Sequence, residues 1–262
     1  MKTRIQTPKK ILIIGSTCVD IIINVDHLPK TEEDIHPFSQ SMALGGCAYN
    51  AANIIRQFGA PHTFISPVGT GVYGDYVRKE LKQKGFPVLA DVPDQENGCC
   101  YCLVERGGER TFMSLHGAEY TFSRTWMEPF EKETFDMTYV CGLEVEEAEA
   151  CALTGCSQAR EAAEALAQRT ENTVIVTLGK DGACCLEKDG SFYQIPAYPA
   201  QVADTVGAGD SHIGTVRACL SLGYSMREAL HAAGRVSAAV VSVKGASLTE
   251  EEFSKLDLKT GF

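Results

Sequence analysis

The feature that most restricts the fold of this chain is an alternation of apolar, strand-like runs with amphipathic helices that end at glycine. Ile11–Ile14 is an uninterrupted apolar run that ends in Gly-Ser, as expected for a strand buried on both faces. A helix opens after Gly45-Gly46 and spaces its apolar residues at i, i+3, i+4 and i+7. The run Thr63–Val68, a second helix to Lys84 and a strand near 88–90 follow. This βαβ order predicts an α/β fold with a mostly parallel sheet covered by helices.

Two segments outside this alternation are predicted to form a small exposed sheet. Residues 24–44 are more polar, contain prolines and show only short alternations. Residues 99–115 alternate on both sides of a turn at Arg106-Gly107-Gly108-Glu109, which predicts a hairpin. We expect the hairpin to pair with the earlier segment as a lid, with strands within about 21–44 and 99–116.

The second half of the chain continues with strands and ends in a pair of helices. Strands are predicted at Phe135–Val140, Val174–Thr177 and Ala183–Leu186, and helices at about 144–153, 157–169, 209–220 and 225–241. Ser225 and Glu228 have the spacing of a capping box at the start of the last helix. A length of 262 residues fits one large domain, 1–262, and not an array.

Composition excludes several classes of partner. The chain has 24 Lys and Arg against 34 Asp and Glu, a net charge of −10, which argues against nucleic acid as a partner. No apolar run approaches the roughly 20 residues that a membrane-spanning helix needs, so no membrane partner is expected. The eleven cysteines are scattered through apolar segments and are predicted to be reduced thiols of a cytoplasmic protein. Cys99 and Cys102 form a lone CxxC, a weak indication of a zinc or redox site.

The strongest local signal for chemistry is Asp204-Thr-Val-Gly-Ala-Gly-Asp210, a glycine-rich turn directly before a helix. Its backbone amides and the helix N-terminus favour an anion such as a phosphate group being transferred. Asp210 is placed where a carboxylate could face both that anion and an acceptor hydroxyl. The alternative is an ordinary glycine turn in which Asp210 only caps the helix.

This heptapeptide resembles the C-terminal signature of the ribokinase-like (PfkB) carbohydrate kinases. Gly45-Gly46-Cys-Ala-Tyr-Asn50 is similar to the N-terminal signature of that family, and Gly15–Asp20 looks like its first strand with a substrate-binding aspartate. Thr177-Leu-Gly179-x-x-Gly182 and Lys244-Gly245-Ala246 look like its nucleotide-binding turns. The resemblance covers nearly the whole chain.

The resemblance implies a three-layer α/β/α fold with a β-sheet lid, and transfer of the ATP γ-phosphate to a hydroxyl of a sugar or nucleoside. It implies ATP and Mg²⁺ as cofactors, with K⁺ as a further candidate. From exposed apolar strand edges, and not from the resemblance, we expect a homodimer through the lid strands. The residue roles that it implies are Asp210 as base, with Gly207, Ala208 and Gly209 as the anion hole; Asp20, Gly45, Gly46 and Asn50 for the acceptor; Thr177, Gly179, Gly182, Asp204, Thr205, Lys244 and Gly245 for the nucleotide; and Glu149 for the metal. For Asn50, the alternative is a structural role in fixing the Gly-Gly turn.

Three features depart from the family pattern. Between Val140 and the helix that bears Glu149, about one βαβ unit of 30 or more residues looks absent. Glu146 stands where the family has an asparagine, which places a negative charge beside the phosphates unless Mg²⁺ compensates. His212 stands at a usual aromatic position, where packing is the more common role and contact with phosphate the alternative. Because the absent unit would remove inner strands, we expect marginal stability and weak turnover.

Two alternative functions stay open. Gly69-x-Gly71-x-x-Gly74, with Asp91 about 20 residues later, fits the fingerprint of a dinucleotide-dependent oxidoreductase. That reading leaves Gly45-Gly46 and Asp204–Asp210 unexplained. The absent unit and Glu146 motivate the second alternative, a relative that binds sugar or nucleotide without turnover.

Overall fold

The computed structural model describes residues 7–107, 109–140, 150–151, 154–256 and 258. The chain falls into two compact units, Thr7–Gly142 and, in its second half, Leu143–Phe262. Each unit is described by itself. The prediction of a single domain over 1–262 therefore stays a prediction.

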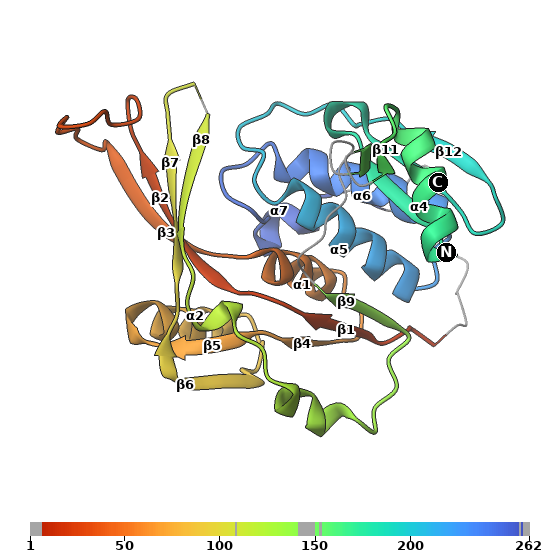
Figure 1. Ribbon diagram of the computed structural model, residues 1–262, viewed down its shortest axis with the longest axis horizontal. Helices are drawn as coiled ribbons and strands as arrows, with labels where there is room; N and C mark the ends of the chain where they lie inside the picture. Colours follow the sequence, from red (N-terminus) through yellow and green to blue (C-terminus); the bar gives the residue numbers. More distant parts are fainter. Residues whose placement is uncertain (1–6, 108, 141–149, 152–153, 257, 259–262) are drawn as a thin grey trace. The chain divides into compact units, whose positions relative to one another are not determined.

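The first unit is built around a short parallel sheet. β1 (Ile11–Ile14) lies between β4 (His62–Ile65) and β9 (Met137–Val140), and it is parallel to both (Figure 1). Ile11 and Ile13 are fully buried, as predicted for an uninterrupted apolar strand in the middle of a sheet. The predicted α/β architecture is confirmed for this unit.

Two helices and a second strand pair complete the parallel part of this unit. α1 (Cys47–Gln57) buries Ile54 and Ile55, and α2 (Gly71–Gln83) buries Val77 and Leu81. The predicted single strand 63–68 is wrong in one respect, because the chain forms two strands there: β4 ends at Ile65 and β5 (Pro67–Thr70) pairs in parallel with β6 (Ala90–Glu96). A proline at the start of β5 suits the change of partner, since proline has no amide hydrogen to donate.

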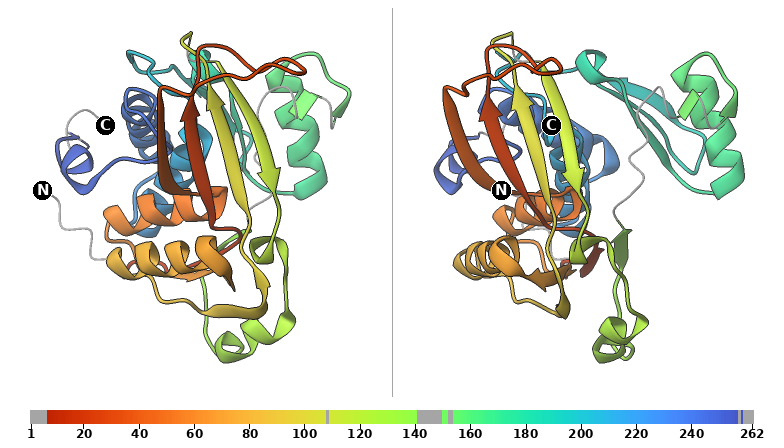
Figure 2. Two further views of the ribbon diagram at one scale, coloured as in Figure 1. Left: turned by 90° about the vertical axis from the view of Figure 1, so that its left-hand side faces the viewer. Right: turned by 60° about the vertical axis from the view of Figure 1, so that its left-hand side comes forward.

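The predicted lid is a four-stranded sheet with the order β3-β2-β7-β8 (Figure 2). β2 (Cys18–Asn24) pairs antiparallel with β3 (Ser39–Gly45) and parallel with β7 (Cys99–Val104), which forms the predicted hairpin with β8 (Arg110–Leu115). The hairpin pairs with β2, of which residues 21–24 fall within the predicted lid bounds, and the lid assignment itself stays a prediction. β2 begins closer to β1 than residue 21, so the lid starts at Cys18.

The segment after the lid covers a satellite core. η1 (Ala118–Tyr120) and η2 (Arg124–Phe130) are 3₁₀ helices, and side chains of the second, including Trp126, pack against a buried cluster of Leu12, Ile65 and Ala90. β9 then pairs with β1 and with no other strand of the described residues, and Val140 at its end is exposed.

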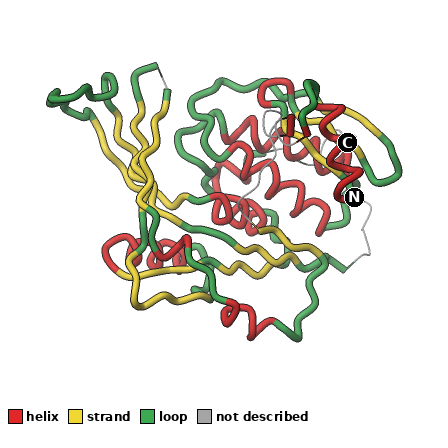
Figure 3. Tube along the Cα trace, in the orientation of Figure 1, coloured by secondary structure: helices red, strands yellow, loops and turns green. Residues whose placement is uncertain are grey.

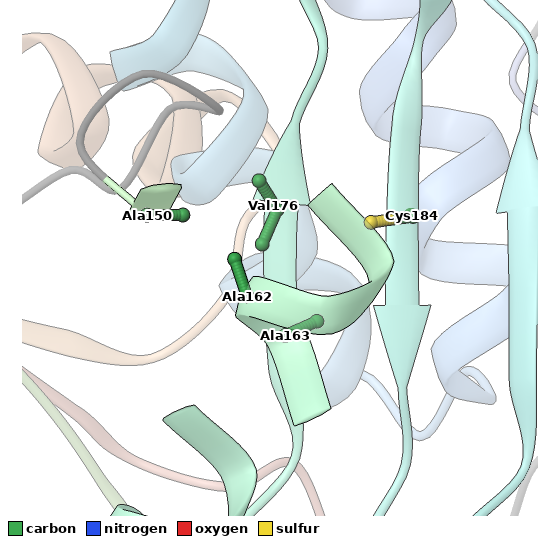
Figure 4. Packing of buried hydrophobic residues seen from close by; sticks show 5 residues of the cluster. All are labelled: Ala150, Ala162, Ala163, Val176 and Cys184. Atoms are coloured by element: carbon green, nitrogen blue, oxygen red, sulfur yellow. The ribbon is translucent and has the colours of Figure 1, made fainter. Parts of the chain in front are cut away.

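The second unit begins with a helix packed on an antiparallel sheet. α4 (Ala159–Thr170) places Ala162 and Ala163 against Val176 and Cys184, and Ala150 joins the same cluster (Figure 4). β10 (Val174–Thr177) and β11 (Ala183–Leu186) have the predicted bounds, and β12 (Phe192–Ile195) completes the sheet. The small alanine side chains let the helix approach the sheet closely.

Two long helices form the rest of this unit. α5 (Ala208–Ser221) and α6 (Met226–Val240) lie side by side, and the short α7 (Glu250–Ser254) follows (Figure 3). The predicted capping box is present: the Ser225 hydroxyl accepts from the Glu228 amide, and the Glu228 carboxylate accepts from the Ser225 amide. The predicted helix 144–153 lies mostly outside the described residues.

None of the ten cysteines among the described residues forms a disulfide bond. Within the described part of the chain, no helix has the length and apolar character needed to cross a bilayer.

Candidate active site

Two of the predicted acceptor residues, Asp20 and Gly45, meet where β2 pairs with β3. Cys18 of β2 lies opposite Gly45 of β3, which brings Gly45 against the Asp20 side chain. A Cβ atom at residue 45 would overlap the Asp20 carboxylate, so only glycine leaves room for that group. The structure therefore brings Asp20 and Gly45 together, and Asp20 is partly exposed.

Gly46 and Asn50 are held by the start of α1. Gly46 is the N-cap residue, with a φ of 97° that favours glycine, and its carbonyl accepts from the Asn50 amide at 2.9 Å. The Tyr49 amide donates to the Ser16 carbonyl at 3.4 Å, which joins the helix to the loop after β1. Asn50 is buried inside the first turn and does not cap the helix. Its predicted roles in acceptor binding and in fixing the turn both stay predictions.

Three thiols share the lid face of Asp20. The Cys18 Sγ donates to Asp20 Oδ1 at 3.6 Å, and the Sγ atoms of Cys100 and Cys102 lie 3.8 Å apart. Burial, reinforced by the charge of Asp20, raises the pKa of Cys18 and of Cys102 far above the ordinary thiol value. The thiols of Cys18 and Cys102 are therefore protonated at neutral pH and weak nucleophiles.

The CxxC pair does not act as a unit. Cys99 and Cys102 are three residues apart on β7, and side chains at that spacing point to opposite faces of a strand. The pair that shares a face is Cys100 and Cys102. The sequence predicted only that the side chains of this strand alternate between its two faces. The pairing of β7 with β2 was needed to show that Asp20 lies beside it.

A buried carboxylate that sequence analysis missed fixes the start of β7. Glu119 accepts from the amides of Gly98 (2.7 Å) and Gly117 (2.8 Å) and from Asn97 Nδ2 (3.2 Å). Asn97 Oδ1 in turn accepts from the Gly69 amide of β5 at 2.6 Å. This chain of bonds ties the lid hairpin to the parallel part of the same unit.

The second unit holds the glycine-rich turn, and Asp204 fastens it. Asp204 is buried; its Oδ1 accepts from the Val206 amide at 3.0 Å and its Oδ2 from the Gly245 amide at 2.7 Å. The Val241 carbonyl accepts from the amides of Ala203 (2.7 Å) and Asp204 (3.1 Å). Two turns that are about 40 residues apart in the sequence are thus joined by one carboxylate.

Gly207 shapes the start of α5. It is the N-cap residue in the left-handed conformation, with a φ of 76°, and a Cβ atom there would overlap the backbone of Ala246. The first i→i−4 bond of the helix runs from the Ser211 amide to the Gly207 carbonyl at 2.8 Å. The amides of Gly209 and Asp210 precede that bond, as first-turn amides do, and they give this end its positive potential.

Asp210 lies within the first turn of α5 and is 8% exposed. The N-cap is Gly207 and no side chain caps the helix, so the alternative reading of Asp210 as the cap is wrong. A carboxylate in the first turn is stabilised by the helix dipole. Ser237 of α6 donates to the Ala208 carbonyl at 3.1 Å and braces the same turn from the neighbouring helix.

His212 is a packing residue. It is buried, and burial lowers its pKa to about 4, so the imidazole is neutral at physiological pH. A neutral imidazole offers a phosphate no positive charge, which argues against the alternative role in phosphate contact.

The remaining nucleotide-side residues lie in turns of the second unit. Thr177 ends β10 and pairs with Ala183, and η3 (Gly179–Asp181) connects the two strands, closed by a 2.7 Å bond from the Leu178 amide to the Gly182 carbonyl. Thr205 and Lys244 are exposed. Glu149 and Glu146, the predicted metal-side residues, lie outside the described residues.

The glycines of the dinucleotide fingerprint have structural roles. A Cβ atom at Gly69 would overlap the Gln95 carbonyl, and one at Gly74 would overlap the Gly69 carbonyl. Asp91 forms an ion pair with Arg78, which also donates to the carbonyl groups of Val68 and Gly69. Close packing at the two glycines and the ion pair of Asp91 account for this motif, so a bound pyrophosphate is not needed to explain it.

Comparison with known proteins decides between the alternatives. A sequence profile described as "pfkB family carbohydrate kinase" matches residues 8–145 and 137–252. The chain belongs to the pfkB carbohydrate kinase family. It is therefore a kinase with a hydroxyl acceptor, and the oxidoreductase reading is wrong.

Relatives and solved structures support this assignment. The pfkB chain is 29% identical over 292 residues to an uncharacterized sugar kinase, YegV, of Escherichia coli strain K12, over 92% of this chain and 91% of that protein. The fold matches Arabidopsis thaliana ribokinase complexed with ribose and ATP (TM-score 0.78, 21% identity, 98% and 100% of the two chains). It also matches phosphofructokinase-2 of Escherichia coli in complex with potassium (TM-score 0.77, 19% identity, 95% and 98%).

The comparisons also bear on the absent central unit. Since 92% of the 262 residues is about 241, some fifty of the 292 aligned positions have no counterpart in this kinase. The profile matches in two stretches that overlap at residues 137–145. The overlap of the two matched stretches lies close to Val140, whereas the aligned length gives the number of unmatched positions and not their place.

Proposed function

We propose that this pfkB kinase transfers the γ-phosphate of ATP to a hydroxyl group of a small sugar, with Asp210 as the general base. The observation that carries the proposal is the Asp210 carboxylate in the first turn of α5, three residues after the left-handed Gly207, which packs against the backbone of Ala246. The names of the relatives favour a sugar over a nucleoside as acceptor.

Phosphoryl transfer needs positioning, an anion hole and a proton acceptor. The amides of Gly209 and Asp210, with the positive end of a 14-residue helix, would hold negative charge on the phosphate in flight. Gly207 and Ala208 set the direction of those amides. Asp210 would accept the proton of the attacking hydroxyl.

The acceptor would be held by residues of the first unit. Asp20 and Asn50 present a carboxylate and an amide, which together can accept from and donate to neighbouring hydroxyl groups. Gly45 keeps the space beside Asp20 open, because any larger residue would overlap the carboxylate. Gly46 sets the start of the helix that carries Asn50.

The nucleotide would be held by Thr177, Gly179 and Gly182 after β10 and by the turn at Lys244 and Gly245, which Asp204 fixes. Thr205 lies beside Asp204 in the glycine-rich turn. Mg²⁺ would neutralise phosphate charge, and Glu149 would help to hold the ion. K⁺ is proposed as an activator, which higher turnover in potassium than in sodium buffer would support.

The lid is proposed as a homodimer interface. β8 presents Phe112, Met113 and Leu115 with more than half of each side chain exposed. Exposed apolar side chains on a sheet edge favour association with a second copy. Sedimentation of the wild-type chain and of Met113→Asp, which should be monomeric, tests this.

The test of the proposed function is turnover by Asp210→Asn. The amide keeps the shape of the side chain but cannot accept the hydroxyl proton, so kcat should fall by about 10²–10⁴ while nucleotide affinity changes little. A panel of sugars and nucleosides, screened by thermal shift with and without Mg·ATP, first identifies the acceptor.

Asp189→Asn, in an exposed turn of the same unit, is the matched control and should keep wild-type turnover. Near-wild-type turnover by Asp210→Asn would show that the base is wrongly assigned. Binding of sugar and ATP by the wild type without any turnover would contradict the proposed phosphate transfer.

A further inference from the structure

One face of the lid sheet carries an unusual set of side chains around the proposed sugar-binding carboxylate. β2 and β7 are parallel and in register, with Asp20 directly opposite Cys100 and Ile22 opposite Cys102. Side chains at i and i+2 on a strand share a face, so Asp20, Cys100 and Cys102 point to the same side of the sheet. None of the roles proposed for sugar phosphorylation uses the two thiols.

The three side chains have the spacing of a metal site. One carboxylate oxygen of Asp20 and the Sγ atoms of Cys100 and Cys102 all lie within 4.8 Å of one another. Two thiolates bound to one tetrahedral zinc ion at about 2.3 Å lie about 3.8 Å apart. The separation of the Cys100 and Cys102 Sγ atoms is 3.8 Å, so the thiols already have the distance that the ion requires.

We propose that Asp20, Cys100 and Cys102 form an inhibitory Zn²⁺ site on the lid, in which the ion binds the carboxylate that would otherwise hold the sugar. The three groups supply two sulfur ligands and one oxygen ligand, and water takes the fourth position. Binding releases the two thiol protons to solvent. Asp20 and Cys100 are partly exposed, which gives the ion access, and Cys102 is buried behind them.

The surroundings support a soft metal over Mg²⁺ or Ca²⁺. Thiolates select zinc and similar ions, whereas Mg²⁺ and Ca²⁺ prefer sites built from oxygen alone. The Ser114 hydroxyl of β8 lies 3.4 Å from the Cys100 Sγ and the Cys18 thiol lies 3.6 Å from Asp20 Oδ1, so neighbouring groups orient the ligands. The site draws its ligands from two paired strands, a rigid support.

Direct metal binding tests the site without any substrate. The full chain, kept reduced by a phosphine that does not bind metals, is titrated with Zn²⁺ against a chromophoric chelator and, separately, with Co²⁺. We expect one Zn²⁺ per chain and the thiolate charge-transfer and tetrahedral d–d absorption bands of bound Co²⁺. Cys100→Ser and the double variant Cys100→Ser/Cys102→Ser should bind Zn²⁺ at least about a hundredfold more weakly, since even outer-shell partners contribute 10- to 100-fold.

The matched control is Cys151→Ser/Cys156→Ser, which removes two thiols from the other unit. It should keep the stoichiometry, the affinity and the cobalt bands of the wild type. The proposal is overturned by a wild-type chain that binds no stoichiometric Zn²⁺, or by Cys100 and Cys102 variants that bind it like the wild type. Because Cys100 is partly exposed, we expect Cys100→Ser to fold, and this single variant provides the test should the double variant not fold.

The inhibitory part rests on the proposed function, because it takes Asp20 as the sugar-binding residue. In the wild type, buffered Zn²⁺ should raise the KM for sugar and leave kcat and the KM for ATP unchanged. In Cys100→Ser, Zn²⁺ should no longer raise the KM for sugar. Zinc binding with an unchanged KM for sugar would refute the inhibition but would still support the metal site. Absence of any sugar turnover would refute the proposed function, while the cobalt bands would still report on the site.

Discussion

Asp20 shows how much of a residue's role depends on its neighbours. The carboxylate lies at the point where β2 meets Gly45 of β3 on one side and Cys100 of β7 on the other. A short acidic side chain next to a glycine leaves an open polar position, which suits a ligand with several hydroxyl groups.

Asp20→Ala should weaken sugar binding about 10- to 150-fold and leave ATP binding within about twofold. A hydrogen bond to a charged group contributes about 1.5–3 kcal/mol, and the residue belongs to the acceptor-side unit. Titration calorimetry with each ligand measures both affinities. Asp34→Ala, an exposed lid carboxylate, is the control, and equal losses for both ligands would mean that Asp20 is structural.

His212 makes the stability of the kinase depend on pH. Its pKa falls from an ordinary 6.5 to about 4 on folding, so the unfolded chain binds the proton more readily between those values. The stability that this residue contributes is fully present above about pH 6.5 and is lost as the pH falls toward 4. Between pH 7 and pH 5 the loss from this residue should be about 2 kcal/mol.

Urea unfolding at pH 7 and pH 5, compared between the wild type and His212→Gln, measures this loss. Because the variant has its own stability at pH 7, the quantity to compare is the change in the free energy of unfolding between the two pH values. A change as large in His212→Gln as in the wild type would assign the acid sensitivity to other groups.

At the scale of elements, the lid hairpin depends on one buried carboxylate. Glu119 holds Gly98 at the start of β7 and Gly117 after β8, and through Asn97 it reaches β5. Three donors would lose their acceptor together if the carboxylate were removed, and buried donors without partners are costly.

Glu119→Ala should lower the free energy of unfolding by at least about 2 kcal/mol. It should also speed hydrogen exchange in β7 and β8 more than in α5 and α6, because the lost contacts are all in the lid-bearing unit. Urea unfolding and exchange mass spectrometry provide the two measurements. Glu128→Ala, exposed on η2, is the control, and uniform acceleration of exchange would contradict the proposed anchoring.

At the scale of the whole molecule, the chain is shorter than its relative. The alignment with the bacterial sugar kinase leaves about fifty positions without a counterpart. Loss of inner parallel strands would remove partners to which backbone groups of a longer sheet bond.

We therefore expect a melting temperature at the low end of the mesophile range, and weak turnover. Insertion of a strand–helix–strand unit from a relative between Val140 and Glu146 should raise both together, measured by calorimetry and by kinase assay. A Gly-Ser insert of equal length is the control and should raise neither. Melting of the present chain above about 65 °C with brisk turnover would show that the short sheet is sufficient.

Much of the fold could be predicted from the sequence because the relevant interactions are local. The bounds of β1, β10 and β11, the capping box at Ser225 and the glycine-rich turn before α5 follow from periodicity and from short-range bonds. The signature residues of the kinase family lie within such local motifs, which is why the family was predicted correctly.

The tertiary structure decided what depends on strand register and on contacts distant in the sequence. The division of 63–68 into β4 and β5, the bond from Gly245 to Asp204, and the Glu119 anchor all join residues whose relation no local pattern expresses. The meeting of Asp20 with Cys100 and Cys102 depends on the register of β2 against β7, and a shift of one residue would turn every side chain of one strand to the opposite face. Sequence alone determined which local elements form, because their bonds are short-range; pairing across the sheet determined which side chains meet.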